Sequence, residues 1–176
     1  SIFTSKNILI LVIGCCLLGY LYQGPPFRLG YMGLGEPLCW IAFGPLAYSA
    51  ALIALDPLEI YWTSTPWKES LLLGSGPSLA TTLVLFCSHF HQIFEDKRHG
   101  KNSPLVRLGA KKGADLVPWI IFVIYSFQIF TIFLGFIPSF CLLYFVSLPQ
   151  ALKLINLLKS SYKNPSTISN CKFIAI

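Results

Sequence analysis

The sequence predicts an all-α fold, a polytopic bundle of about five transmembrane helices that forms one domain over residues 1–176. Three observations support this class. Hydrophobic residues make up 55% of the chain and charged residues only 11%, with a mean hydropathy of +0.66, which is too apolar for a water-soluble domain. The apolar residues gather in runs that approach the ~20 residues of a membrane-crossing helix. Short polar segments rich in proline, glycine and charge separate these runs.

The first two predicted crossings lie near 8–22 and 34–55. The first is a run of roughly fifteen apolar residues, which needs the preceding turn to reach across a bilayer. Two prolines at 25–26 end it, because proline cannot continue a helix and restricts the residue before it. The second crossing contains Pro37 and Pro45, which predict a kinked or partly broken helix that its neighbours must complete.

Three further crossings follow the same reasoning. The third is predicted near 70–92, and a long basic loop is expected over 93–113. The apolar stretch after that loop runs for about 35 residues, which is too long for one untilted helix. We therefore expect a fourth crossing near 115–133 and a fifth near 136–157, with Gly135 at the turn between them.

The basic residues are distributed unevenly along this topology. If five crossings alternate in direction, eleven of the thirteen lysines and arginines fall on one side and two on the other. The positive-inside rule places the crowded side in the cytoplasm or, in a plastid, the stroma. Topology and lipid head groups then explain the net charge of +6 and exclude a nucleic-acid partner. The eleven are Arg28, Lys97, Arg98, Lys101, Arg107, Lys111, Lys112, Lys153, Lys159, Lys163 and Lys172, and the two are Lys6 and Lys68.

Charged side chains gather where the third crossing meets the basic loop. Glu95 and Asp96 begin the loop, Lys101 and Arg107 follow, and Arg28 comes from another loop on the same predicted side. Carboxylates are hard ligands for Mg²⁺, which usually bridges to phosphate oxygens, and lysine and arginine complement the remaining phosphate charge. The pattern suits an isoprenoid diphosphate, with an anionic head and a hydrocarbon tail. The alternative is a solvated loop whose charges only orient the protein in the membrane.

Several sequence blocks carry a more specific signal. They are YQGPPFRLGY (22–31), GLGEPLC (33–39), FGPL (43–46), CSHFHQ (87–92) and SPLVRLG (103–109). In this order they resemble the UbiA superfamily of intramembrane prenyltransferases, and within it the cyanobacterial and plastid branch that makes phylloquinone. The resemblance implies a bundle of nine transmembrane helices around a central cavity, of which this chain looks like helices four to eight.

The resemblance also implies a chemistry and a location. Family members hold Mg²⁺ between two acidic motifs and transfer an isoprenoid from its diphosphate to an aromatic carbon. In this branch the implied donor is phytyl diphosphate and the implied acceptor is 1,4-dihydroxy-2-naphthoate, which loses its carboxylate. The implied location is a thylakoid or inner envelope membrane, with membrane lipids around the bundle.

Site residues follow from the resemblance position by position. Asp96 matches the last aspartate of the second acidic motif, and Gln92 matches the residue four positions earlier, so both are expected to be catalytic. Asp96 and Glu95 are the expected metal ligands. The residues that match diphosphate contacts are Arg28, Lys101 and Arg107.

Two departures from the family pattern leave the activity open. The first acidic motif is absent, since no Asn-x-x-x-Asp occurs in the chain, and Phe94 stands where the branch usually carries an acidic residue. Glu95 could substitute, although one position along a helix turns a side chain by about 100°. We therefore expect no catalysis by this chain alone, with the missing half disordered, unsequenced or supplied as a separate chain. The alternative is a non-catalytic, UbiA-like structural subunit of a thylakoid photosystem complex.

Three other features can be interpreted either structurally or functionally. His89 and His91 stand two apart, on different faces of a helix, which favours polar residues lining the cavity over a shared Zn²⁺ site. The small residues at 74–76 favour a close helix contact over a phosphate loop. Glu36 is either a cavity residue or a carboxylate at the start of a helix.

Overall fold

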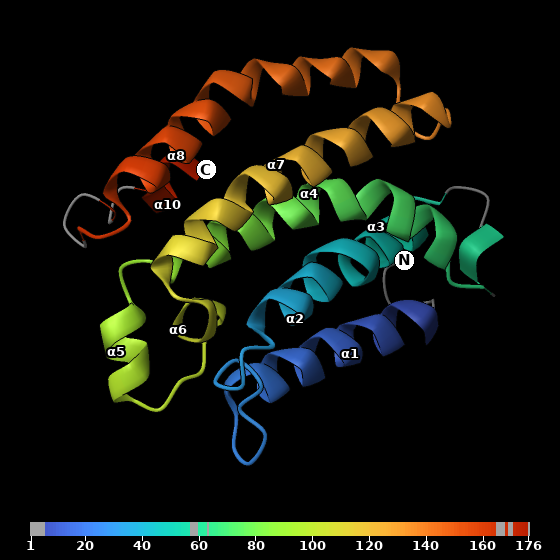
Figure 1. The fold of residues 1–176 in the computed structure, drawn as a ribbon. Coiled ribbons are helices and arrows are strands. Elements are labelled where there is room, and N and C mark those ends of the chain that lie inside the picture. The colour runs from blue at the N-terminus through green and yellow to red at the C-terminus, as the bar shows by residue number, and fades with distance from the viewer. Residues whose placement is uncertain (1–5, 57–59, 63, 165–167, 169–170, 176) are drawn as a thin grey trace.

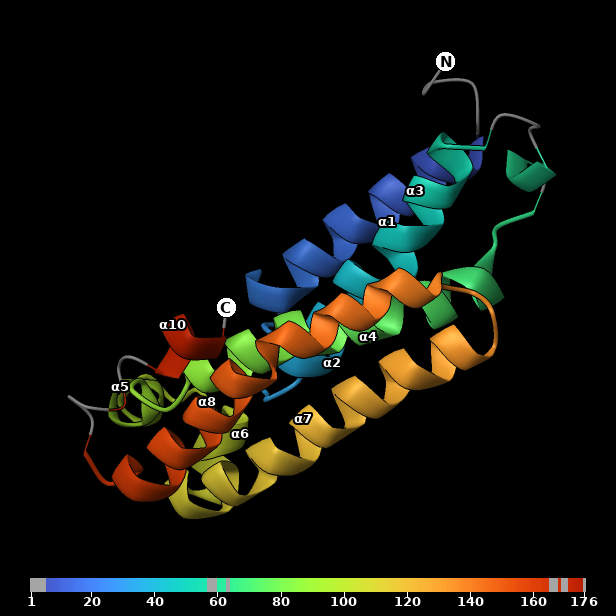
Figure 2. The ribbon, with the colours of Figure 1, turned by 90° about the horizontal axis from the view of Figure 1, so that it is seen from above.

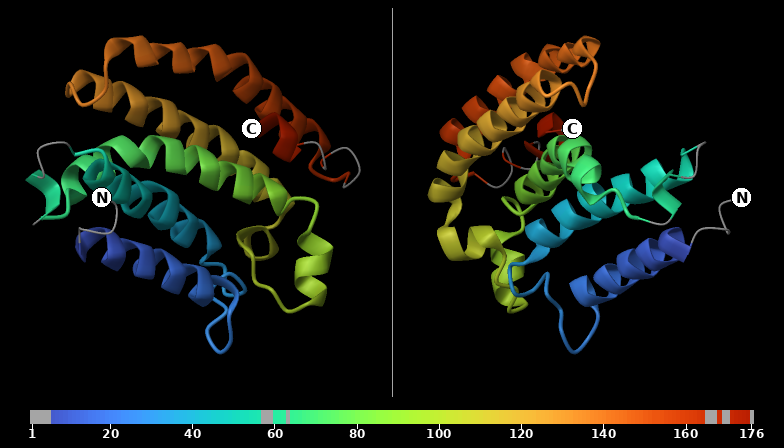
Figure 3. Two further views of the ribbon diagram at one scale, coloured as in Figure 1. Left: turned by 180° about the vertical axis from the view of Figure 1, so that it is seen from behind. Right: turned by 90° about the vertical axis from the view of Figure 1, so that its right-hand side faces the viewer.

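The computed structural model describes residues 6–56, 60–62, 64–164, 168 and 171–175, and the regular elements in these ranges are helices. Five of them are long and apolar enough to cross a membrane, which confirms the predicted fold class. The five spans follow one another side by side around an open arc (Figure 1 and Figure 3). The loop after the first span and the short helices after the third lie at the same end of the bundle, where these spans end.

The five spans are built from eight helical elements. They are α1 (Lys6–Gln23); the continuous run of α2 (Gly35–Ile41), the π-helical turn η1 (Ala42–Leu46) and α3 (Ala47–Ala54); α4 (Trp67–Ser88); α7 (Ala110–Phe133); and the 3-10 helix η3 (Ser139–Ser147) continued by α8 (Leu148–Ser161). Shorter elements connect them: η2 (Ile60–Trp62), α5 (Ile93–Arg98), α6 (Pro104–Leu108) and α10 (Cys171–Ala175).

The second span contains a wide turn where the sequence predicts a kink. Pro45 lies inside η1, where its missing N–H and its ring prevent the regular hydrogen bond to the preceding turn. The chain accommodates the proline by taking one π-helical turn, and the helix then continues as α3. Beyond this turn, the hydroxyl of Ser49 lies 2.6 Å from the hydroxyl of Ser70 on α4, and both are buried.

Small residues bring α4 close to its neighbours, as the run at 74–76 predicts. A Cβ added to Gly74 would lie 2.8 Å from the ring of Tyr48, and one added to Gly44 would lie 2.6 Å from the hydroxyl of Ser78. On the other side, a Cβ on Gly76 would lie 3.0 Å from the side-chain oxygen of Gln128 on α7. The glycines therefore serve helix packing on both sides of α4.

The third span ends earlier than the sequence suggests. The predicted crossing near 70–92 stops at Ser88, and 89–92 form turns instead of a further helical turn. The expected basic loop at 93–113 holds two short helices, α5 and α6, and the start of α7. Pro104 opens α6 in the first helical turn, where its missing N–H leaves no bond unmade.

The apolar core lies between α4, α7, α8 and α10. Leu105 of α6 is fully buried in this cluster and lies against Gly113 at the start of α7. The thiol of Cys171 donates to the carbonyl oxygen of Cys87, 3.1 Å away, and joins α10 to α4. Figure 2 shows α10 lying beside α4 and α8. The outward faces of α1 and α7 are rich in exposed apolar side chains, as expected for surfaces that contact lipid.

Candidate functional site

Two segments that are distant in sequence meet at one end of the bundle. The loop after α1 and the chain after α5 are joined by a hydrogen bond from the backbone N–H of Asn102 to the carbonyl oxygen of Tyr31, 2.7 Å. The guanidinium of Arg107 donates to the carbonyl oxygen of Met32 beside it. Gly33 allows this approach, because it has a φ of +77° and an added Cβ would lie 2.5 Å from the carbonyl oxygen of Asn102.

The end of α5 brings Lys101 back to Asp96. Gly100, with a φ of +70°, turns the chain after the helix. The backbone N–H of Lys101 then donates to the carbonyl oxygen of Asp96, 2.8 Å, and the N–H of Gly100 to that of Lys97, 3.2 Å. This pair of bonds is a Schellman motif, which satisfies carbonyls at a helix end. It also places the Nζ of Lys101 3.3 Å from a carboxylate oxygen of Asp96.

A polar hollow of about 280 Å³ lies between these two segments. Four residues with roles expected from the sequence line it together, namely Gln92, Glu95, Asp96 and Lys101. Five further lining residues were not singled out from the sequence: Tyr22, Gln23, Gly30, Tyr31 and His99. Four of these five lie within or just before the YQGPPFRLGY block, so the block itself was the available signal.

The two expected arginines lie outside the lining of the hollow. Arg28 is exposed, has a φ of +44°, and stacks its guanidinium 5.7 Å from the ring centroid of Tyr31. Because Tyr31 lines the hollow, Arg28 stands at its rim. Arg107 donates to the Met32 carbonyl oxygen and therefore stabilises the loop after α1.

Phe94, where the resemblance implies an acidic residue, and its neighbour Glu95 point in different directions. Phe94 is 77% exposed, whereas Glu95 lines the hollow beside Asp96. Both residues belong to α5, and a shift of one residue turns the side chain by about 100° around a helix. In this chain that turn brings the carboxylate of Glu95 to the hollow and leaves Phe94 outside.

A buried line of charged and polar groups runs from the second span to the hollow. The Nε2 of His89 lies 3.4 Å from a carboxylate oxygen of Glu36, and its Nδ1 lies 3.3 Å from the second oxygen of Asp96. His89 is only 3% exposed and Asp96 7%. His89 can reach both carboxylates because α4 ends at Ser88 and the turn that follows reorients the chain. The sequence left the role of Glu36 open, and the structure pairs it with His89.

The carboxylates of this site suit a hard cation such as Mg²⁺. The oxygen of Asp96 that faces His89 is buried and makes no fully formed hydrogen bond among the described residues. Mg²⁺ in proteins commonly takes one or two carboxylates, several waters and the phosphates of a substrate. Asp96 and Glu95 could supply such a partial set. Within the described ranges, no three His, Cys, Asp or Glu side chains gather as a complete protein-only site.

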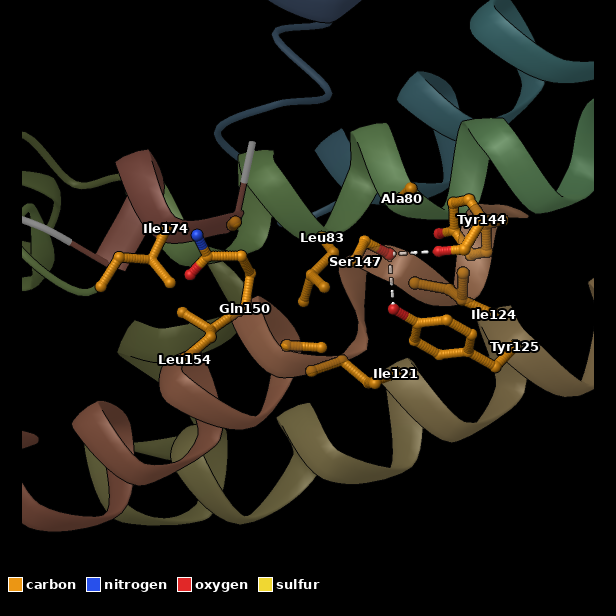
Figure 4. A pocket seen from close by; sticks show the side chains of 12 residues that line it. Ala80, Leu83, Ile121, Ile124, Tyr125, Tyr144, Ser147, Gln150, Leu154 and Ile174 are labelled. Atoms are coloured by element: carbon orange, nitrogen blue, oxygen red, sulfur yellow. Dashed lines mark hydrogen bonds between the residues drawn. The ribbon is translucent and has the colours of Figure 1, made fainter. Parts of the chain in front are cut away.

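A second, mainly apolar hollow of about 440 Å³ lies among α4, α7, η3, α8 and α10 (Figure 4). Leu83, Ile121, Ile124 and Leu154 point into it. Its main polar feature is a chain of hydrogen bonds from the hydroxyl of Tyr125 to that of Ser147, 2.7 Å, and from Ser147 to the Tyr144 carbonyl, 2.7 Å. The tyrosine hydroxyl is therefore already paired, and the hollow presents mostly hydrocarbon.

These features define a class, a polytopic helical membrane protein with a charged hollow at one end of its bundle and an apolar one among its spans. Comparison with known proteins identifies the family within this class. The model of the UbiA prenyltransferase family matches residues 1–175, and the chain belongs to that family.

Two relatives carry closely similar sequences. The chain is 41% identical over 170 residues to the 2-carboxy-1,4-naphthoquinone phytyltransferase of Synechocystis sp., covering 97% of this chain and 53% of that protein. It is 38% identical over 185 aligned positions to the chloroplastic 2-carboxy-1,4-naphthoquinone phytyltransferase of Arabidopsis thaliana, covering 99% of this chain and 47% of that protein. The chain thus spans about half the length of both relatives. No solved structure shows a significant match.

Proposed function

We propose that this chain forms the diphosphate-binding wall of a membrane prenyltransferase that transfers a phytyl group to a naphthoate-type aromatic acceptor. The observation that carries the proposal is the pairing of Lys101 with the buried Asp96 in a polar hollow at the mouth of an apolar bundle. Membership of the prenyltransferase family and the names of the two phytyltransferase relatives support it. The basic end of the bundle faces the cytoplasm or stroma in this proposal, by the positive-inside rule.

The charged and amide residues in and beside the hollow have distinct tasks in this scheme. Lys101 binds a diphosphate oxygen through a charge-assisted hydrogen bond, and the amide of Gln92 donates a second one. Arg28 at the rim neutralises the charge of the entering head group. Asp96 and Glu95 hold Mg²⁺, which when bound acts as a Lewis acid on the leaving diphosphate.

The apolar hollow among the spans receives the hydrocarbon tail in this proposal. Its lining is mainly leucine, isoleucine and alanine side chains, and in this proposal the bound tail displaces water, which would otherwise capture a carbocation. The allylic carbon–oxygen bond breaks, the diphosphate leaves with the electron pair, and an aromatic carbon of the acceptor attacks the allylic cation. The acceptor then loses its carboxylate as carbon dioxide and recovers its aromatic ring.

Binding of the donor provides the test, because the chain contains no Asn-x-x-x-Asp segment and turnover would not isolate this wall. The chain in lipid nanodiscs is titrated with a hydrolysis-resistant phytyl thiolodiphosphate and Mg²⁺ by calorimetry. Saturable binding is expected, and Lys101→Gln should weaken it by about 10-fold or more, since a hydrogen bond to a charged group is worth ~1.5–3 kcal/mol. Lys97→Gln is the matched control, because Lys97 is an exposed lysine of α5, four residues before Lys101. Equal effects of the two substitutions, or equally tight binding of phytol, would contradict the proposal.

A further inference from the structure

Glu36 and His89 stand behind the hollow without lining it. Asp96 is among the described residues that line this hollow, whereas neither Glu36 nor His89 is. Glu36 lies in the first turn of α2, His89 follows the end of α4, and Asp96 belongs to α5. The three side chains therefore connect three separate elements, and Glu36 reaches Asp96 through the ring of His89.

The two oxygens of Asp96 have different partners. One lies 3.3 Å from the Nζ of Lys101 and the other 3.3 Å from the Nδ1 of His89. Two contacts on opposite oxygens restrict rotation of the carboxylate plane, which decides where its lone pairs point. The other ring nitrogen of His89 is directed to Glu36 at 3.4 Å, which restricts rotation of the imidazole in turn.

The ring nitrogens of His89 lie close to the two carboxylates, but the angles are poor for hydrogen bonds. Its Nδ1, the facing oxygen of Asp96 and both oxygens of Glu36 are buried and lack a fully formed hydrogen bond among the described residues. Catalytic hydrogen bonds are often long in ligand-free sites and tighten when the ligand arrives. Residues that orient a metal ligand from behind commonly change metal affinity by about 10–100-fold when they are replaced.

We propose that Glu36 and His89 are positioning residues, in which the ring of His89 holds the carboxylate of Asp96 toward the hollow and Glu36 holds that ring. The inference rests on the proposed function, since it takes Asp96 as the residue that meets the Mg²⁺–diphosphate group. Neither residue touches the ligand in this arrangement. Both act on the affinity for it through the orientation of Asp96.

Replacing His89 by asparagine or by glutamine can test its contact with Asp96 and its contact with Glu36 separately. In His89→Asn the amide nitrogen lies where Nδ1 was and keeps a donor toward Asp96, whereas in His89→Gln it lies where Nε2 was and faces Glu36. If the line works as proposed, His89→Gln should weaken binding by about 10–100-fold. His89→Asn should weaken it at least as much as Glu36→Gln does. His89→Asn removes the contact with Glu36, whereas Glu36→Gln keeps an amide oxygen as acceptor and removes only the charge.

The experiment measures binding of Mn²⁺ with inorganic pyrophosphate to the chain in nanodiscs, by the electron paramagnetic resonance signal of free Mn²⁺. A double-mutant cycle supplies the decisive readout, since residues that act through one another give non-additive effects. Glu36→Gln should lower the affinity in the wild-type background and add nothing in the His89→Gln background. Glu69→Gln, at the opposite end of α4, is the matched control and should leave the affinity unchanged.

The outcomes separate this inference from the proposed function. Loss of binding in Asp96→Asn with unchanged binding in His89→Gln and Glu36→Gln overturns the positioning role alone. Additive effects of the two substitutions also overturn it, as do lower melting temperatures with unchanged affinity, which indicate a purely structural role. Failure of the wild-type chain to bind Mn²⁺ and pyrophosphate, or full binding by Asp96→Asn, overturns the proposed function itself.

Discussion

Gly33 stands where the loop after α1 meets the chain after α5, and its replacement by alanine tests whether that contact assembles the hollow. Two effects add in Gly33→Ala. A left-handed backbone, here with φ of +77°, disfavours an L-residue by about 1–2 kcal/mol. The new Cβ would also lie 2.5 Å from the carbonyl oxygen of Asn102. It would push the two segments apart and break the hydrogen bond between Asn102 and Tyr31, a loss of about 1 kcal/mol.

Gly135→Ala provides the matched control for the backbone effect. Gly135 has a φ of +76°, and an added Cβ meets no atom within 4 Å. Its substitution should therefore lower the free energy of unfolding by only ~1–2 kcal/mol, whereas Gly33→Ala should lower it by ~2–3 kcal/mol. Reversible unfolding in mixed detergent micelles measures both values.

The same pair of variants tests the link to the site. Gly33→Ala should weaken binding of phytyl thiolodiphosphate, because Tyr31 and Lys101 both line the hollow and belong to the two segments that the substitution pushes apart. Gly135→Ala, at the turn between α7 and η3, should leave the affinity unchanged. Equal destabilisation by the two substitutions, or an unchanged affinity in Gly33→Ala, would refute the reasoning.

Three further predictions concern packing in the bundle. Gly74→Ala crowds the ring of Tyr48 and should lower the free energy of unfolding by about 1–3 kcal/mol. Gly14→Ala, with open space around it, should not lower it. Unfolding in mixed micelles measures both variants. Leu105→Ala empties a fully buried position and should lower the same quantity by ~2–5 kcal/mol, with faster hydrogen exchange in α6. Ser49→Ala removes a buried interhelical hydrogen bond and should destabilise by only ~0.6 kcal/mol, so a loss above 2 kcal/mol would contradict this account.

The membrane-crossing segments could be predicted from the sequence because their length and hydropathy are properties of the chain itself. The candidate hollow could be predicted in part for a similar reason. Gln92, Glu95, Asp96 and Lys101 lie within ten residues of one another, so a single local structure, α5 and its terminal turn, gathers them.

Contacts between distant segments could not be predicted in the same way. Spacing along one helix shows which side chains share a face, but it does not show which helices become neighbours. The pairing of Glu36 with His89 depends on α2 packing against α4. It also depends on α4 ending at Ser88, where the apolar pattern continued without a strong stop signal. Arg28 was placed in the correct loop, yet its side chain turned to the ring of Tyr31, a choice that only the folded loop decides.

The wide turn Ala42–Leu46 sets the rotational phase of everything that follows it in the second span. A π-helical turn holds one residue more than an α-helical turn, so removing one residue there would rotate the rest of the span by about 100°. Ser49 would then face away from Ser70, and Tyr48 would leave the groove above Gly74. Deletions at this point should be tolerated far less than conservative replacements, and functional relatives should keep the length of this turn even where its residues change.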